Sequence, residues 1–300
     1  MNSQHSSGAS APQEGFISVA GAKLHYRAIG QGLPIILVHG GPGFDHHYLR
    51  PDMDRLAASF RLIYYDQRGR GQSAWIAEPT PVSLQSELDD LETLRAEMHL
   101  DQTALLGHSW GGLLALEYAL RHPERVSQVI LLNTCPVSYE DFHLFKEQLS
   151  ARDPEDAERM RILESRPAFA DGDPETRAAY YRLYFQPTLR PSGLLDRLIA
   201  HLQVGWTKES VLIARVTTRN LFPDTVELPE YNLLPQLTGL RIPTIVLHGD
   251  YDFVPVASAS HIAEAIPGAR FVVLSDCGHF SYIEQPEGVR AVVCEFIEAN

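Results

Sequence analysis

The chain has 300 residues, the length of one large α/β domain or of two ordinary ones. Hydrophobic residues make up 44% of it and charged residues 21%, so the composition excludes a wholly disordered protein. The 38 acidic residues outnumber the 25 lysines and arginines. The resulting formal charge of −13 argues against nucleic acid and anionic membrane surfaces as partners.

The cysteines and the N-terminus indicate the cellular setting. Cys135, Cys277 and Cys294 are too few and too scattered for a disulfide scaffold or a zinc site. Residues 1–14 are rich in Ser, Gly, Ala and Gln, lack the pattern of a signal peptide, and predict a disordered tail. Because no apolar run approaches the ~20 residues that span a bilayer, we expect a cytoplasmic protein.

Strand-like and helix-like segments alternate along the first half of the chain. Residues 16–28 predict a hairpin around Gly21-Ala22. Continuous apolar runs, typical of strands covered on both faces, follow, and apolar residues at helical spacing lie between them. The predicted strands are 34–39, 61–65, 103–106 and 126–132, and the predicted helices are 84–98 and 112–121. This order favours a mostly parallel sheet flanked by helices.

A long middle segment interrupts the alternation. Residues 137–237 contain no comparable strand pattern and hold helical patterns broken by prolines. Strand patterns return at 243–247 and 270–274, and a helix is predicted at 286–298. We therefore expect one core, formed by 15–136 and 238–300, that is interrupted by a helical insertion at 137–237.

The pentapeptide Gly-His-Ser-Trp-Gly at 107–111 carries the strongest chemical signal. It follows a predicted strand and opens a predicted helix, which is the context of a nucleophile elbow. Glycines flank such a serine because bulkier neighbours would clash at the sharp turn, and the helix N-terminus favours developing negative charge. We predict that Ser109 is the nucleophile.

A serine nucleophile requires a base and an orienting carboxylate. The loops after the last two predicted strands supply Asp252 as the acid and His279 as the base, in the order Ser, Asp, His that is typical of the α/β-hydrolase fold. Asp250 and Asp276 compete for the role of the acid. Asp250 lies nearer its strand and is better suited to anchoring the turn through backbone hydrogen bonds.

The oxyanion hole is expected to combine two backbone amides, those of Trp110 and Gly41. Gly41 belongs to the loop His-Gly-Gly-Pro-Gly at 39–43, whose glycines, Gly40 included, let the backbone approach a substrate closely. The loop lacks a nucleotide-binding glycine pattern, and the pair His46-His47 lacks a third ligand at metal spacing. We therefore expect no cofactor and no metal.

Three blocks of sequence resemble the proline iminopeptidases of the α/β-hydrolase fold. They are the 39–43 loop, the segment Asp-Gln-Arg-Gly-Arg-Gly-Gln-Ser at 66–73, and the elbow with its tryptophan. The resemblance covers roughly 16–135 and 240–298. It implies that 137–237 forms a cap over the site, and that the substrate is a short peptide whose N-terminal proline is released.

The resemblance also implies that acidic cap residues hold the charged nitrogen of the proline, since a desolvated ammonium group needs a partner. Here the sequence departs from the family, because Leu221 stands in Asn-Leu-Phe where the family carries a glutamate. The run Trp206-Thr-Lys-Glu209 partly matches another cap feature, so Trp206 and Glu209 are candidate substrate-binding residues. Glu227 and Glu230 are further candidates without a motif.

Two other functions remain open. A carboxylesterase or lactonase would use the same Ser-His-Asp triad on a small neutral ester and would need fewer acidic residues in the cap. A non-catalytic relative acting as a ligand receptor would be recognised by a broken triad, whereas all three members are present here. The sequence does not predict an oligomeric state.

Overall fold

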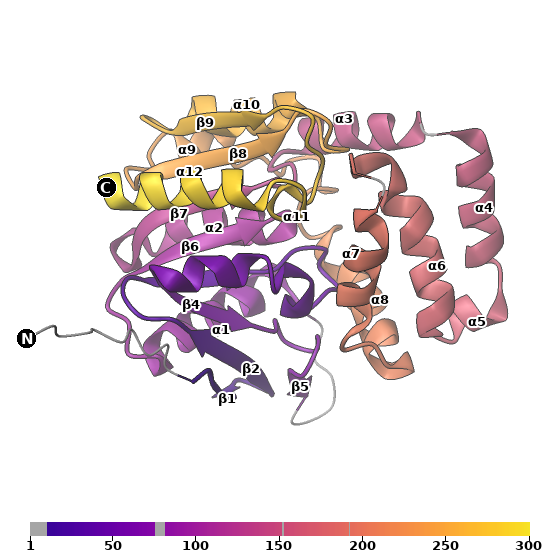
Figure 1. Ribbon diagram of the computed structural model, residues 1–300, viewed down its shortest axis with the longest axis horizontal. Coiled ribbons are helices and arrows are strands. Elements are labelled where there is room, and N and C mark those ends of the chain that lie inside the picture. Colours follow the sequence, from indigo (N-terminus) through magenta and orange to yellow (C-terminus); the bar gives the residue numbers. More distant parts are fainter. Residues whose placement is uncertain (1–10, 76–81, 152, 192) are drawn as a thin grey trace, which may run out of the picture.

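The computed structural model describes residues 11–75, 82–151, 153–191 and 193–300. Its nine strands form one sheet in the order β1-β2-β4-β3-β6-β7-β8-β9, with β5 paired to β2 (Figure 1). The strands are β1 (Gln13–Val19), β2 (Ala22–Ile29), β3 (Pro34–Val38), β4 (Arg61–Tyr65), β5 (Ala74–Trp75), β6 (Thr103–His108), β7 (Val126–Leu132), β8 (Thr244–Gly249) and β9 (Arg270–Leu274).

The sheet is antiparallel at one edge and parallel over the rest. Strand β2 pairs antiparallel with β1, β4 and β5, and the five pairs from β4–β3 to β8–β9 are parallel. The predicted hairpin and the six further predicted strands are confirmed. The short strand β5 was not predicted, because two residues carry no periodic signal.

Helices cover both faces of the sheet, which explains the continuous apolar runs of the strands. In β3, Ile36 and Val38 pack into one core with residues of α1 and α2, and Ile35 and Leu37 pack into a second core with α12. The helices are α1 (Leu84–Glu97), α2 (Trp110–Arg121), α3 (Tyr139–Ser150), α4 (Pro154–Glu164), α5 (Pro167–Ala170), α6 (Pro174–Phe185), α7 (Leu194–Gln203), α8 (Lys208–Leu221), α9 (Leu234–Leu237), α10 (Val256–Ala265), α11 (Ser281–Glu284) and α12 (Pro286–Ala299). Short 3₁₀ helices lie at His46–Leu49, Met53–Ala58, Pro123–Arg125 and Gln186–Thr188.

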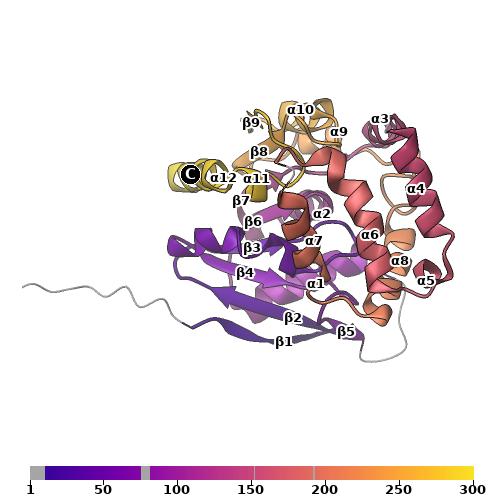
Figure 2. The ribbon, with the colours of Figure 1, turned by 45° about the vertical axis from the view of Figure 1, so that its right-hand side comes forward.

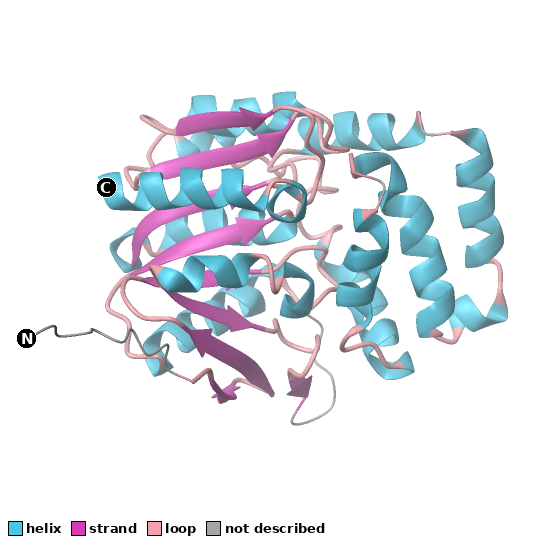
Figure 3. Ribbon diagram, in the orientation of Figure 1, coloured by secondary structure: helices cyan, strands magenta, loops and turns pink. Residues whose placement is uncertain are grey.

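Helices α3 to α8 gather at one end of the sheet (Figure 2). They lie between β7 and β8 in the sequence, and the parallel strands point toward them (Figure 3). Proline at the first turn starts α4, α5 and α6, where its missing N–H costs no helical hydrogen bond. The segment predicted to be helical is therefore placed at the carboxyl ends of the strands, where open α/β sheets bind their ligands.

The structure tests two further expectations, the disordered N-terminal tail and the absence of a membrane-spanning segment, only in part. The predicted disordered tail, 1–14, falls largely outside the described residues. Its predicted end is wrong by two residues, because β1 already begins at Gln13. None of the helices in the described ranges is both long and apolar enough to cross a bilayer.

Candidate active site

Ser109 occupies the turn between β6 and α2, as the pentapeptide predicts. Its backbone has φ 54° and ψ −120°, a conformation that side chains rarely adopt. The flanking glycine Gly111 is required by packing, because a Cβ there would collide with the carbonyl oxygen of Val38 in β3. The local sequence therefore holds Ser109 at the start of α2, close against the end of the sheet.

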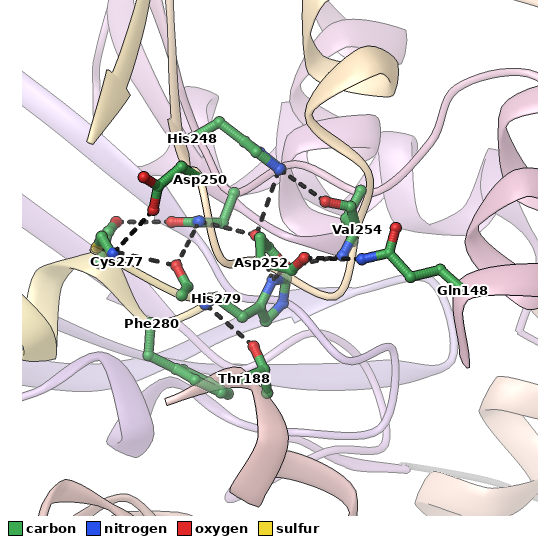
Figure 4. Close-up of polar contacts among 12 residues, drawn as sticks. Gln148, Thr188, His248, Asp250, Asp252, Val254, Cys277, His279 and Phe280 are labelled. Carbon is green, nitrogen blue, oxygen red and sulfur yellow. Dashed lines mark hydrogen bonds and ion pairs between the residues drawn. The ribbon is translucent and has the colours of Figure 1, made fainter. Parts of the chain in front are cut away.

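Asp252 and His279 meet across two loops that follow β8 and β9 (Figure 4). His279 Nδ1 lies 2.9 Å from Oδ1 and 3.0 Å from Oδ2 of Asp252, and both residues are buried. An ionised carboxylate only accepts hydrogen bonds, so Nδ1 carries the proton and Nε2 is left with its lone pair. The pair thus presents a basic nitrogen in the required tautomer.

The Asp252 carboxylate is kept ionised by its surroundings. Burial alone would raise its pKa, but the electrostatic interactions with His279 and His248 and the hydrogen bonds it accepts outweigh burial and lower the pKa below its usual value. The N–H of Val254 donates to Oδ1 at 2.9 Å, and the Asn133 side-chain amide donates to Oδ2 at 2.8 Å. Each carboxylate oxygen therefore has a partner besides His279.

Asn133 lies at the end of β7 and has φ 47°, a conformation that asparagine tolerates better than most residues. Besides Asp252, its amide nitrogen donates to the carbonyl of Gly278 at 2.9 Å. Its oxygen accepts a hydrogen bond from the Ser281 hydroxyl at 2.6 Å. Asn133 thus ties the acid loop to the histidine loop, a role that the sequence analysis missed.

Glu284 holds the backbone on both sides of His279. Its carboxylate accepts hydrogen bonds from the N–H groups of Gly278, at 3.0 and 3.1 Å, and of Phe280, at 3.2 Å. The N–H of His279 itself donates to the carbonyl of Thr188 at 3.1 Å. The position of the imidazole is therefore fixed through the backbone as well as through Asp252.

The two competitors of Asp252, and the neighbouring Cys277, have other roles. Asp250 Oδ1 accepts a hydrogen bond from the N–H of Cys277 at 3.2 Å, which is the turn-anchoring role expected for it. Asp276 lies 2.6 Å from the guanidinium of Arg190 near the surface. Cys277 is fully buried, and burial raises the pKa of its thiol, so it behaves as a packed small residue.

Ser109 and His279 line one cavity of about 430 Å³, a size suited to a small molecule. Its floor comes from the loops that follow the parallel strands, and its walls come from α3, α6 and α8. Thirteen of the 33 lining residues are aromatic: Phe44, Tyr48, Trp110, Phe142, Phe145, Tyr180, Tyr181, Tyr184, Phe185, Trp206, Phe222, Phe253 and Phe280.

Most residues expected to bind substrate or to form the oxyanion hole border this cavity. Gly41, Trp110 and Trp206 line it. Gly40 lies just behind, with its N–H bonded to the hydroxyl of Tyr48 at 2.7 Å, and a Cβ on Gly40 would lie 2.8 Å from the Cβ of Ser109. Gly40 therefore lets the loop approach the nucleophile closely.

The acidic cap residues are placed elsewhere. Glu209 is exposed in the first turn of α8 and does not line the cavity, so the structure does not support it as a substrate-binding residue. Glu227 lies 3.7 Å from Lys146, and Glu230 is exposed. Helical geometry explains why Glu209 does not reach the cavity, because the face of α8 toward the cavity carries Val211, Arg215 and Thr218.

Tyr48 and His108 form a buried chain of hydrogen bonds that the sequence analysis missed. The Tyr48 hydroxyl lies 2.8 Å from His108 Nδ1, and His108 Nε2 lies 2.9 Å from the carbonyl of His279. Because a carbonyl only accepts, Nε2 donates, and Nδ1 accepts from Tyr48. The chain connects the 39–43 loop with the elbow and the histidine loop.

His108 is held in its neutral form. Burial, with a smaller contribution from His279, lowers the pKa of His108 to about 3. The neutral ring is also what the chain of hydrogen bonds requires, since one nitrogen donates and the other accepts. The sequence does not predict this role, because His108 occupies an unspecified position of the Gly-x-Ser-x-Gly pattern.

A second buried cluster joins two loops near the site. His25, His46 and Asp66 each bring a possible metal-binding atom within 4.8 Å of the others. Asp66 Oδ1 lies 2.6 Å from His46 Nδ1 and accepts the His46 N–H at 3.0 Å, while Oδ2 accepts the N–H of Gln72 at 2.9 Å. Since these hydrogen bonds already engage the carboxylate, the cluster is suited to joining the loops after β3 and β4.

Comparison with known proteins agrees with this fold. Residues 34–286 match the model of the alpha/beta hydrolase fold family. The chain therefore belongs to the alpha/beta hydrolase fold family, and the expected class of enzyme, a serine-type hydrolase, is confirmed at the level of the family.

Individual proteins of known name are similar to this chain over nearly its whole length. A proline iminopeptidase of Saccharolobus solfataricus is 27% identical over 296 residues, which cover 95% of this chain and 92% of that protein. This similarity over nearly the whole chain confirms the resemblance seen in the three blocks. Two solved structures share the fold: an esterase from Thermogutta terrifontis (TM-score 0.70, 24% identity, covering 96% of this chain and 98% of that one) and a proline iminopeptidase from Mycobacterium smegmatis (TM-score 0.72, 22% identity, covering 96% and 98%).

Proposed function

We propose that the protein is a serine hydrolase that releases N-terminal proline, or a similar residue, from small peptides through an acyl-enzyme. The observation that carries the proposal is the buried Asp252–His279 pair, which shares one cavity with Ser109 at a strand-to-helix turn. Similarity to proline iminopeptidases over nearly the whole chain supports the choice of substrate.

In the proposed mechanism Ser109 Oγ attacks the acyl carbon while His279 Nε2 takes its proton. Asp252 holds the imidazole in the correct tautomer and stabilises the imidazolium that forms. The amides of Gly41 and Trp110 stabilise the oxyanion. His279 then gives its proton to the leaving amine. In the second half of the reaction water attacks the acyl-enzyme while His279 takes its proton, and His279 returns that proton to Ser109 Oγ as the acid is released.

We further propose that 137–237 acts as a cap that closes the cavity. The support is that α3, α6 and α8 supply its walls, whereas Ser109 and His279 belong to the core. Acidic groups in the cavity are scarce. Among the described residues that line it, Asp45 carries a carboxylate, so Asp45 replaces Glu209 as the candidate partner of a prolyl nitrogen.

The scarcity of acidic groups also favours the second candidate, a carboxylesterase or lactonase that acts on small neutral esters. The aromatic residues of the wall suit an uncharged acyl group. An esterase shares the fold, although at 24% identity this likeness speaks for the fold alone.

Hydrolysis of proline p-nitroanilide and of short p-nitrophenyl esters separates the two candidates. We expect prolyl amide cleavage that is abolished by Ser109→Ala. An Asp45→Asn variant should raise KM for the prolyl amide and leave KM for the esters unchanged, with Glu209→Gln as the matched control outside the cavity. Ester cleavage without any prolyl amide cleavage would replace the first candidate by the second.

A further inference from the structure

We infer that the cap side of the cavity binds a free carboxylate of the substrate, away from the bond that is cleaved. The inference rests on the proposed function, because it takes this cavity as the substrate site. Its basis is a cluster of three arginines in the cavity wall, Arg177 of α6 with Arg215 and Arg219 of α8.

Arg177 is a buried cation without a counter-ion. The residue is 9% exposed, and its guanidinium lies 4.2 Å from the centre of the Phe169 ring, 5.8 Å from that of Tyr181 and 6.0 Å from that of Tyr180. Within the described ranges it has neither a carboxylate within 4.0 Å nor a hydrogen-bond partner. A ring face compensates only part of the cost of burying a charge. An anion in the cavity would supply the missing partner.

Arg215 lies beside the same phenylalanine. Its Nη1 donates to the carbonyls of Phe169 and Ala170 at 3.3 and 3.2 Å, the last residues of α5. These bonds orient the guanidinium through one nitrogen, while an arginine offers five N–H donors over three nitrogens. The other donors of Arg215 remain for a ligand, and Arg219 adds a third cation one turn further along the same face of α8.

Of the other charged side chains in the described cavity wall, Arg70 is paired with a buried glutamate, and Asp45 contacts a histidine and is the proposed partner of the prolyl nitrogen. Arg70 lies 2.8 Å from Glu87, and Asp45 lies 3.0 Å from His47. The unpaired charge of the wall is therefore positive, although the segment 137–237 holds 16 acidic residues against 12 basic ones and is net −4. Arginines concentrated in the cavity of an acidic chain indicate selection for an anionic group on the ligand.

A carboxylate is the group that fits this wall, because the guanidinium fork binds its two oxygens together. Ser109 and the arginines border the same cavity of about 430 Å³, so one small molecule must reach both. For a peptide the carboxylate is the free C-terminus of a dipeptide or tripeptide. For an ester it is an acid group on the alcohol or the acyl part.

Matched pairs of ligands test the inference and separate these sources. The first pair is Pro-Gly and its C-terminal amide; the second is 4-carboxyphenyl acetate and 4-carbamoylphenyl acetate. We expect the acid of at least one pair to have a KM about tenfold lower than its neutral partner. Arg177→Gln and Arg219→Gln should remove this difference without changing KM for the neutral partner, and Arg177→Lys should restore part of it.

Arg182→Gln is the matched control, since Arg182 lies on α6, pairs with Asp196 and does not line the cavity. Melting temperatures identify variants that fail to fold, and Arg219, which is exposed, keeps the test available if Arg177 variants do not fold. If the unaltered protein has the same KM for the acid and for its neutral partner in both pairs, the inference is overturned, while the proposed function stays intact.

Calorimetric binding to the Ser109→Ala variant makes the test independent of turnover. Tighter binding of the acid than of its neutral partner, lost with Arg177→Gln, supports the carboxylate site even if neither pair is hydrolysed. In that case the proposed substrate would fail and the inferred site would stand. Equal binding of both partners overturns the site.

Discussion

The hydroxyl of Tyr48 lies 2.8 Å from Nδ1 of His108, and this contact joins the three loops that build the site. Tyr48 accepts the N–H of Gly40 at 2.7 Å, and His108 reaches the carbonyl of His279 at 2.9 Å. The donor and acceptor of each hydrogen bond in this series are determined, because the series begins at the Gly40 N–H and ends at the His279 carbonyl.

Removing one hydroxyl should therefore loosen the site. We predict that Tyr48→Phe lowers kcat about tenfold and the free energy of unfolding by about 1–3 kcal/mol, because it leaves His108 Nδ1 and the N–H of Gly40 without partners. Kinetics and urea unfolding measure the two effects. Tyr65→Phe is the control, since the buried Tyr65 hydroxyl has no hydrogen-bond partner in the described part of the chain; equal effects of both substitutions would contradict the role of Tyr48.

His108 also makes a specific contribution to acid sensitivity. Its pKa is lowered from 6.5 to about 3 in the folded protein, so the unfolded chain takes up a proton at this residue that the folded one refuses. The stabilisation is complete above pH 6.5 and is lost as the pH falls toward 3.

We predict that the difference in unfolding free energy between the unaltered protein and His108→Gln shrinks by about 1.4 kcal/mol per pH unit over this window. Urea unfolding at several pH values measures it, and the difference cancels the groups that both proteins share, such as His39 and Asp90. A difference independent of pH would show that His108 is not held neutral.

Glu284 acts on His279 through the backbone. We predict that Glu284→Gln lowers kcat about tenfold, because the two carboxylate oxygens accept from the N–H groups of Gly278, Phe280 and Arg190, whereas a glutamine has one accepting oxygen and an NH₂ group that cannot accept. The expected KM is unchanged, since Glu284 does not line the cavity. Glu287→Gln, an exposed position of the next helix, is the control; a loss confined to KM would argue against this role.

Asp252 sets the tautomer of His279. We predict that Asp252→Asn lowers kcat roughly 10³- to 10⁴-fold with little change in KM, because an asparagine amide can present its N–H to Nδ1 and move the proton to Nε2. Steady-state kinetics measures the loss. Asp250→Asn is the control. An equal loss of kcat in that variant would indicate that Asp250 rather than Asp252 is the catalytic acid.

The parts of this account that the sequence predicted are those with local signals. The apolar runs located six strands, and the pentapeptide at 107–111 located the turn at Ser109. Asp252 and His279 were found because each follows a strand, and the carboxyl ends of parallel strands meet at one edge of a sheet.

The missed residues have no local signal, because their contacts join distant parts of the chain. Tyr48 and His108 are 60 residues apart, and Asn133 and Asp252 are 119 apart. Only the fold brings such pairs together. Glu209 was selected by a motif match, which carries no information about the helical face on which the residue lies, and it does not line the cavity.

Ser109 is proposed to be a nucleophile that is activated by His279 and Asp252. The most direct measurement is treatment of the full chain with a fluorophosphonate, followed by peptide mass spectrometry. We predict a single phosphonylated site at Ser109, formed at a rate that falls at least 100-fold in His279→Ala. Labelling at another residue, or hydrolytic activity that survives Ser109→Ala, would contradict the claim.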